Sequence, residues 1–164
     1  MQKKIINKII LGIDPGIADT GFGVIKNENN KLTCLNYGTI KTPAGMPLSE
    51  RLVILHDELT KIIKKYQPDI AAVEELFFAK NAKTALIVGA ARGVILLTIK
   101  QSSAVFKEFT PLQVKQAIST YGRADKLQVQ KMVKMLLNLD QIPRPDDAAD
   151  ALAIAICAIN KTDY

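Results

Sequence analysis

Pro145-Asp146-Asp147-Ala148-Ala149-Asp150 opens the most informative stretch of this sequence, and an unbroken apolar run, 151–159, follows it. Proline and acidic residues favour the first turn of a helix, where negative charge interacts well with the helix dipole. Beyond that turn the segment is apolar on every face, which is typical of a buried helix. The stretch therefore predicts a buried helix that begins near Pro145.

Two carboxylates share one face of this helix, because Asp147 and Asp150 are three residues apart. Asp150 lies so deep in the apolar pattern that its charge needs a compensating cation. No Lys, Arg or His is among its neighbours along the helix, so a divalent metal ion is the economical partner. Asp146, in contrast, is expected to act as an acidic helix cap.

Further acids follow two apolar strands. Asp14 ends the strand predicted over 9–13, and Glu74 and Glu75 end a similar run that begins at residue 70. Such runs suit central strands covered on both faces, and sites in α/β sheets gather at the carboxyl ends of strands. Neighbouring strands would place Asp14 and Glu74 about 5 Å apart. Asp before Pro-Gly is also an ordinary turn former, but together the acids make an oxygen cage suited to Mg²⁺ or Mn²⁺.

The charge balance indicates a phosphate-rich substrate. The chain has 22 Lys and Arg against 16 Asp and Glu, a formal net charge of +6 and a pI near 9.3. A basic protein with a carboxylate-bound metal favours nucleic acid as its substrate. Basic residues precede the acidic helix at Lys107, Lys115, Arg123, Lys126, Lys131 and Lys134. For Lys131 and Lys134, a solvated helix face is the preferred interpretation.

Length and composition predict a single domain over residues 1–164, with 1–8 as an N-terminal extension. The start has no apolar core long enough for a signal peptide, and Arg92 and glycines interrupt the apolar helix predicted over 84–99. Cys34 and Cys157 read as reduced core cysteines, which favours a cytoplasmic protein. His56 is given no role.

The order of predicted elements indicates an α/β protein. Strands are expected at 9–13, 21–26, 32–39, 70–74 and 105–109, with a hairpin turn at Asn29-Asn30. Helices are expected from Ser49 as cap to Tyr66, over 84–99, from Thr110-Pro111 to Gly122, over 125–138 and from Asp147 onward. This is the order of the ribonuclease-H-like fold, a mixed five-stranded sheet flanked by helices, with the first three strands antiparallel and the later ones parallel.

The chain resembles the RuvC family of Holliday-junction resolvases from about Ile9 to Ile159. The resemblance rests on five blocks in order: Gly12-Ile13-Asp14-Pro15-Gly16, Val73 to Asn81, Gly89-Ala90-Ala91-Arg92-Gly93, Gln113-Val114-Lys115-Gln116 and Asp147 to Ala155. It implies a crossover junction endodeoxyribonuclease, a homodimer that makes metal-dependent, paired symmetric nicks in four-way DNA junctions during recombination and repair. By the same resemblance, a branch-migration helicase complex of RuvA and RuvB is an expected partner.

The resemblance also implies roles for particular residues. The family's metal-binding carboxylates fall on Asp14, Glu74, Asp147 and Asp150, its catalytic lysines on Lys115 and Lys126, and its junction-probing aromatic on Phe77. We expect Lys80 and Arg123 to bind DNA as well. Glu75 and Asp146 duplicate the matched acids, so the ligand within each pair stays open.

A two-metal mechanism follows from these assignments. Two Mg²⁺ ions about 4 Å apart would activate a water and stabilise the leaving oxygen. Asp14 is expected to bridge the ions, with Glu74 on one and Asp147 and Asp150 on the other. Lys126 would offset charge in the transition state, and Lys115 would hold the DNA backbone.

A small-residue stripe on the helix over 84–99 offers a dimer surface. Ala85, Gly89 and Gly93 recur every fourth residue. Because glycine destabilises a helix relative to alanine, two glycines in one helix indicate close packing against another element. Packing of this stripe against the chain's own sheet or a neighbouring helix is, from sequence, equally favoured. Two alternative functions are a catalytically inactive junction-binding module and a phosphotransferase of the actin fold. The latter would need a second domain and a second glycine-rich phosphate loop.

Overall fold

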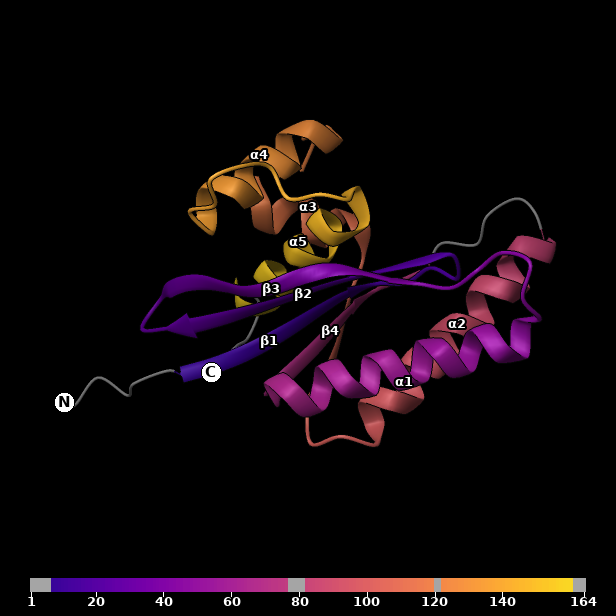
Figure 1. Cartoon of the computed structure of the whole chain (residues 1–164). Helices are drawn as coiled ribbons and strands as arrows, with labels where there is room; N and C mark the ends of the chain where they lie inside the picture. Colours follow the sequence, from indigo (N-terminus) through magenta and orange to yellow (C-terminus); the bar gives the residue numbers. More distant parts are fainter. Residues whose placement is uncertain (1–6, 77–81, 120–121, 161–164) are drawn as a thin grey trace.

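The computed structural model describes residues 7–76, 82–119 and 122–160. Within these ranges the strands are β1 (Asn7–Asp14), β2 (Asp19–Glu28), β3 (Lys31–Lys41), β4 (Ile70–Glu74) and β5 (Val105–Phe109). The helices are α1 (Leu48–Tyr66), α2 (Ala82–Lys100), α3 (Pro111–Ile118), α4 (Lys126–Leu136) and α5 (Asp146–Asn160). The predicted element order is confirmed (Figure 1).

The five strands form one mixed sheet in the order β3-β2-β1-β4-β5. β1 pairs with β2 and β2 with β3 in antiparallel register, whereas β1–β4 and β4–β5 are parallel. The hairpin between β2 and β3 turns at Asn29 and Asn30, whose φ angles are 52° and 68°. Asn tolerates this left-handed backbone better than most residues. The predicted directions of the strands and the hairpin are therefore confirmed.

Helices cover both faces of the sheet, with α1 and α2 on one side and α3, α4 and α5 on the other (Figure 1). Alternate residues of each central strand serve the two cores, as the two-residue period of a strand requires. Ile10 and Ala72 pack with α5, while Leu11 and Ala71 pack with α1 and α2. The central strands are apolar throughout because both of their faces are covered.

Glycines let α5 lie directly on the sheet. A Cβ at Gly12 of β1 would overlap the backbone carbonyl of Ala151, and one at Gly21 of β2 would overlap that of Asp147. Both helix residues belong to the first two turns of α5, so the absence of these two side chains fixes how near the acidic end of α5 comes to β1.

Among the predicted helix ends, the start of α1 and the end of α3 are wrong. Ser49 does not cap α1, because the helix begins at Leu48 and its cap position is Pro47, which makes no side-chain cap bond. α3 ends at Ile118 rather than at Gly122, since the backbone turns extended at Ser119 (φ −129°, ψ 139°). Thr110 does cap α3, in a reciprocal capping box with Gln113.

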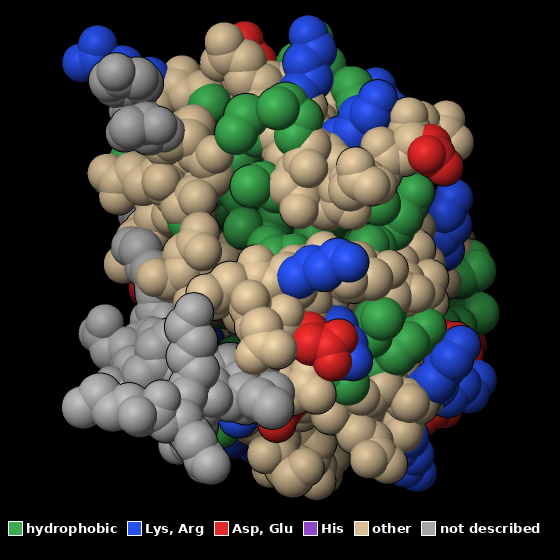
Figure 2. Space-filling model, turned by 90° about the vertical axis from the view of Figure 1, so that its left-hand side faces the viewer, with side chains coloured by type: hydrophobic (Ala, Val, Ile, Leu, Met, Phe, Trp, Pro, Cys, Tyr) green, Lys and Arg blue, Asp and Glu red, His purple; other side chains and the backbone are tan. Residues whose placement is uncertain are grey.

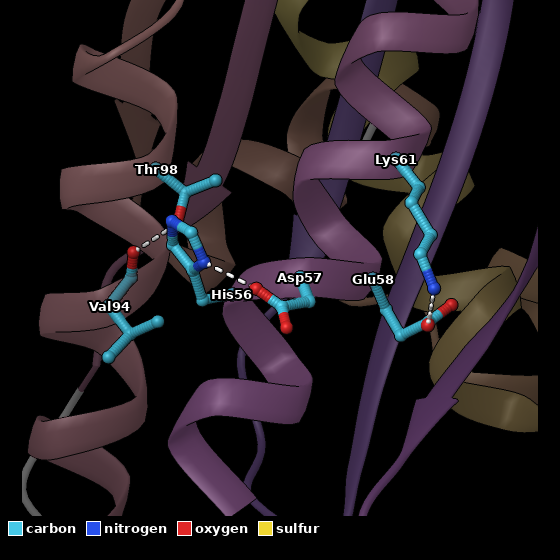
Figure 3. Close-up of polar contacts among 6 residues, drawn as sticks. All are labelled: His56, Asp57, Glu58, Lys61, Val94 and Thr98. Carbon is cyan, nitrogen blue, oxygen red and sulfur yellow. Dashed lines mark hydrogen bonds and ion pairs between the residues drawn. The ribbon is translucent and has the colours of Figure 1, made fainter.

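Helices α1 and α2 lie side by side, and Figure 3 shows polar contacts within them. His56 Nδ1 lies 2.9 Å from a carboxylate oxygen of its neighbour Asp57, while the Thr98 hydroxyl donates to the backbone carbonyl of Val94. These are contacts within each helix, in accord with the absence of a role for His56. In the described part of the chain, no helix is both long enough and apolar enough to cross a membrane.

Candidate active site

Three carboxylates from two distant parts of the chain meet at one end of the sheet. Asp14 is the last residue of β1, and Asp147 and Asp150 lie in the first two turns of α5. One carboxylate oxygen from each residue lies within 4.8 Å of the other two. Alternate residues of a strand point to the same face. Asp14 therefore shares with Ile10 and Gly12 the face of β1 that α5 covers.

Glu74 adds a fourth acid to this group, here called the acid cluster (Asp14, Glu74, Asp147 and Asp150). It ends β4, and the parallel register Ile13↔Val73 makes it the neighbour of Asp14 at the carboxyl ends of both strands. The charge of Glu74 raises the pKa of Asp14. For the adjacent Glu75, the backbone amide donates to the carbonyl of Phe109 on β5. The geometry thus favours Glu74 within this acidic pair.

The acids perturb one another strongly. Burial, together with the charges of Asp150, Glu74 and Asp147, raises the pKa of Asp14 to about 8, against an opposing effect from Lys126. Burial and the charge of Asp150 raise the pKa of Glu74, and Lys115 opposes them. Crowded carboxylates of one charge need a cation to ionise together. The cluster is therefore a site of concentrated negative potential that takes up either protons or a metal ion.

Lys126, the first residue of α4, reaches this cluster from a third element. Its ammonium lies 3.3 Å from Asp150 and 3.5 Å from Asp146. Burial disfavours the charge of Lys126, but these two carboxylates more than offset that effect and raise its pKa. Asp150, whose pKa burial raises, is in turn partly neutralised by Lys126. The expectation that Asp150 lacks a basic neighbour thus holds along α5 only, because the lysine comes from elsewhere in the sequence.

Asp146 is not one of the three acids whose oxygens converge, and its partners are cationic and amide groups. Its carboxylate accepts a hydrogen bond of 3.1 Å from the buried Gln130 and forms ion pairs with Lys126 and Arg144. Desolvation is the largest single effect and raises the pKa of Asp146, but these three partners together outweigh it, and the pKa is lowered. Asp147, in contrast, joins the cluster. The geometry therefore favours Asp147 as the metal ligand of this pair.

The remaining predicted site residues divide into three groups. Lys115 on α3 is close enough to Glu74 to lower its pKa, and Arg123 is exposed in the turn before α4. Phe77 and Lys80 lie outside the described residues.

Lys107 lies apart from the other predicted basic residues. With Lys8 it lines a hollow of about 240 Å³ at the opposite end of the sheet. Figure 2 views that end, where basic side chains are scattered among hydrophobic and acidic ones. Of the basic residues predicted for the site, Lys115 and Lys126 lie near the acid cluster.

The donor set of the acid cluster fits a hard divalent cation. All four side chains offer carboxylate oxygens, the ligands that Mg²⁺ and Mn²⁺ prefer. Three of them already have oxygens within 4.8 Å of one another, and the raised pKa values of Asp14, Glu74 and Asp150 show that negative charge there lacks full compensation. No soft thiolate or imidazole ligand belongs to the group.

Comparison with known proteins identifies the family. The model of the crossover junction endodeoxyribonuclease RuvC matches residues 10–158. A protein of that name from Caldicellulosiruptor saccharolyticus is 57% identical over 92% of this chain and 91% of its own length. The chain belongs to the RuvC family. The Thermus thermophilus RuvC structure in complex with a Holliday junction substrate has a TM-score of 0.87 and 36% identity, and the match covers 92% of each chain.

A more distant structure supports the fold alone. The yeast mitochondrial Holliday junction resolvase matches with a TM-score of 0.66 at 17% identity, over 90% of this chain and 76% of that one. The predicted ribonuclease-H-like fold and the predicted RuvC resolvase, an endodeoxyribonuclease, are confirmed. The actin-fold phosphotransferase is excluded by this RuvC family membership.

The sequence did not point to two features that shape this RuvC-family site. The first is the pair of glycines under α5, Gly12 and Gly21. A glycine on each of two neighbouring strands close to Asp14 could have indicated that a helix packs closely there. The second is Arg92 of α2, which donates to the backbone carbonyl of Glu74. Its signal was a single cation in an apolar helix, within one of the sequence blocks that carry the family resemblance.

Proposed function

We propose that this chain resolves four-way DNA junctions by hydrolysing one phosphodiester in each of two equivalent strands, with divalent metal held by Asp14, Glu74, Asp147 and Asp150. The observation that carries this proposal is the convergence of these four acids at one end of the sheet, with a pKa of about 8 at Asp14. A protein that only bound junctions would have no need to crowd four partly buried carboxylates together, since desolvated charge without a partner is costly.

The resident metal would be Mg²⁺, with Mn²⁺ able to substitute, and the cluster would hold two ions. When bound, the ions would supply Lewis acidity and a nucleophilic water for in-line attack on the phosphodiester. Asp14, at the centre of the cluster, would contact both ions, with Glu74 on one side and Asp147 and Asp150 on the other. Binding requires Asp14 to lose its proton, because metal ligands must be deprotonated.

Two lysines would act on the DNA. Lys126 stands beside Asp150, so its ammonium can offset negative charge that develops on the phosphate in the transition state. Lys115, close to Glu74, would hold the DNA backbone. Arg123 before α4 adds a further phosphate contact, and Phe77 and Lys80 would contact the junction from the segment after Glu74.

The chain would act as a homodimer, because one site cannot reach two symmetric strands at once. Helix α2 offers the surface: Leu86 and Leu97 are 77% and 56% exposed, and no described atom lies within 4 Å of a Cβ built at Gly89 or Gly93. A branch-migration helicase complex of the RuvA and RuvB type would deliver the junction. Cytoplasmic location, the compartment of chromosomal DNA, belongs to the same proposal.

The decisive experiment incubates the purified protein with a synthetic four-way junction and Mg²⁺ and maps the nicks. Asp14→Asn, Glu74→Gln, Asp147→Asn and Asp150→Asn should each abolish cleavage and leave junction binding largely intact, because phosphate contacts dominate affinity. Glu75→Gln, a matched control beside Glu74, should cut like the wild type. Cleavage by Asp150→Asn at the wild-type rate would refute the four-carboxylate site.

The lysines are separated by the same assay. Lys126→Ala should slow cleavage by roughly 2–4 kcal/mol in activation free energy with little loss of affinity, as for other groups that stabilise transition-state charge. Lys115→Ala should weaken both affinity and rate. Lys131→Ala, on an exposed face of the same helix as Lys126, is the control and should leave both unchanged.

A further inference from the structure

Arg92 is a largely buried cation that the proposed reaction leaves without a role. It lies in the middle of α2, and its side chain is only 18% exposed. One guanidinium nitrogen donates to the backbone carbonyl of Glu74 at 3.3 Å, and the other terminal nitrogen forms an ion pair with Glu108. The planar fork of arginine suits such a double contact, which the point charge of lysine matches less well.

These two contacts join three elements at the edge of the acid cluster. Glu74 is the last residue of β4, one residue past the last β1–β4 pair at Ile13↔Val73. Glu108 on β5 is in register with Val73, whose side chain belongs to the core beneath α1 and α2. Arg92 thus extends from α2 to the carbonyl at the end of β4 and is held there by a carboxylate from β5.

We propose that Arg92 is a positioning residue that fixes the backbone of Glu74, with Glu108 as its anchor, so that the placement of α2 sets the geometry of one metal-binding carboxylate. The inference rests on the proposed metal-binding role of Glu74. Arg92 acts through the main chain, because the charges that shift the pKa of Glu74 come from Asp150 and Lys115. Groups that orient a ligand from outside the metal's own shell commonly tune its affinity for the metal.

The competing interpretation is a structural tie that only holds α2 on the sheet. Such a tie would lower the melting temperature when it is broken but would leave metal affinity unchanged in the folded protein. A positioning residue changes metal affinity at temperatures where every variant is fully folded. The two interpretations therefore differ in a measurement that needs no DNA.

The experiment is a calorimetric titration of the full chain with Mn²⁺, well below the melting temperature of each variant. Arg92→Met and Glu108→Gln should each weaken Mn²⁺ binding by roughly 10-fold, the lower end of the range for such outer groups. The double variant should bind Mn²⁺ no more weakly than Arg92→Met, because both substitutions break the same Arg92–Glu108 contact. Lys8→Met breaks an ion pair with Asp69 at the opposite end of the sheet and should leave Mn²⁺ affinity unchanged.

Junction cleavage gives a second readout. The Mn²⁺ concentration for half-maximal cleavage should rise by the same factor in Arg92→Met, and saturating Mn²⁺ should restore most of the rate. Wild-type Mn²⁺ affinity in Arg92→Met, with only the melting temperature lowered, would overturn the inference and leave a structural tie. If Arg92→Met does not fold, Glu108→Gln, which is nearly isosteric, decides in the same way. Absence of Mn²⁺ binding in the wild type would instead refute the proposed metal site, and this inference with it.

Discussion

At the scale of single residues, proton binding at Asp14 links the acid cluster to stability. Its pKa of about 8 lies above its ordinary value of 3.8, so the folded protein binds this proton more tightly than the unfolded chain does. Between these two pH values the unfolded state holds fewer protons, and the free energy of unfolding therefore falls as pH rises. In the metal-free protein, the ionised acid cluster therefore lowers the free energy of unfolding, and the same cluster can bind a cation.

Asp14→Asn should remove this penalty. At pH 8 the metal-free variant should be more stable than the wild type by on the order of 2–4 kcal/mol, since each pKa unit is worth about 1.4 kcal/mol. At pH 4 the two should be nearly equal. Urea unfolding at both pH values in the presence of a chelator measures the difference. A wild type whose stability does not decline between pH 4 and pH 8 would contradict the crowded, buried state of this carboxyl.

The neighbours Asp146 and Asp147 should separate by function. Asp146 is engaged by Gln130, Lys126 and Arg144, so Asp146→Asn should loosen one of the two pairings of Lys126 and slow cleavage by less than about 1.4 kcal/mol, or tenfold. Asp147→Asn should abolish cleavage. Single-turnover rates at saturating Mg²⁺ make the comparison. Equal, complete loss in both variants would place Asp146 among the metal ligands.

At the scale of elements, the short apolar runs of the sequence predicted the central and edge strands well. The bounds of β4 and β5 agree with prediction at both ends. Helix ends were less accurate, because the cap of α1 and the end of α3 depend on backbone angles at Pro47 and Ser119 rather than on a residue type.

The candidate site was predictable only in part. The acids could be found because each ends an apolar strand or begins an apolar helix. The pairing of Lys126 with Asp150 could not be found, because α4 and α5 are separated by a loop whose path the sequence does not reveal. A glycine in a strand likewise indicates that some other segment packs closely there, but not which one. The close packing of α5 on Gly12 could therefore be seen only in the structure.

The close packing of α5 on Gly12 leads to a testable prediction. A Cβ at Gly12 would overlap the carbonyl of Ala151 and lie 2.7 Å from the amide nitrogen of Ala155, so Gly12→Ala should push α5 away from β1. We expect a loss of at least about 1–3 kcal/mol, the usual cost of overpacking, together with weaker Mn²⁺ binding as the acids separate. Gly45→Ala, where no described atom lies within 4 Å, is the control. Thermal unfolding and Mn²⁺ titration with wild-type values for Gly12→Ala would show that α5 is not so closely seated.

At the scale of the whole molecule, the two faces of the sheet carry different features. The face with α5 carries the acid cluster, while the face with α1 and α2 presents an exposed apolar surface on α2. Arg92 connects the two through the end of β4. A second copy bound to α2 would thus contact the helix that holds one carboxylate of the site.

The dimer can be tested at Gly89, in the middle of that surface. The open surroundings of Gly89 mean that Gly89→Leu should not disturb the chain's own packing, whereas a bulky side chain would keep two α2 helices from close approach. We expect the variant to sediment as a monomer at micromolar concentration, where the wild type is a dimer. On a cruciform plasmid, paired nicks give linear DNA and single nicks give open circles, so the product should shift from linear to open circular. Gly45→Leu adds the same side chain at another open position and should keep the linear product. A wild type that is monomeric in sedimentation yet still makes paired nicks would rule out this dimer as the source of symmetry, because the two cuts would then need no partner site.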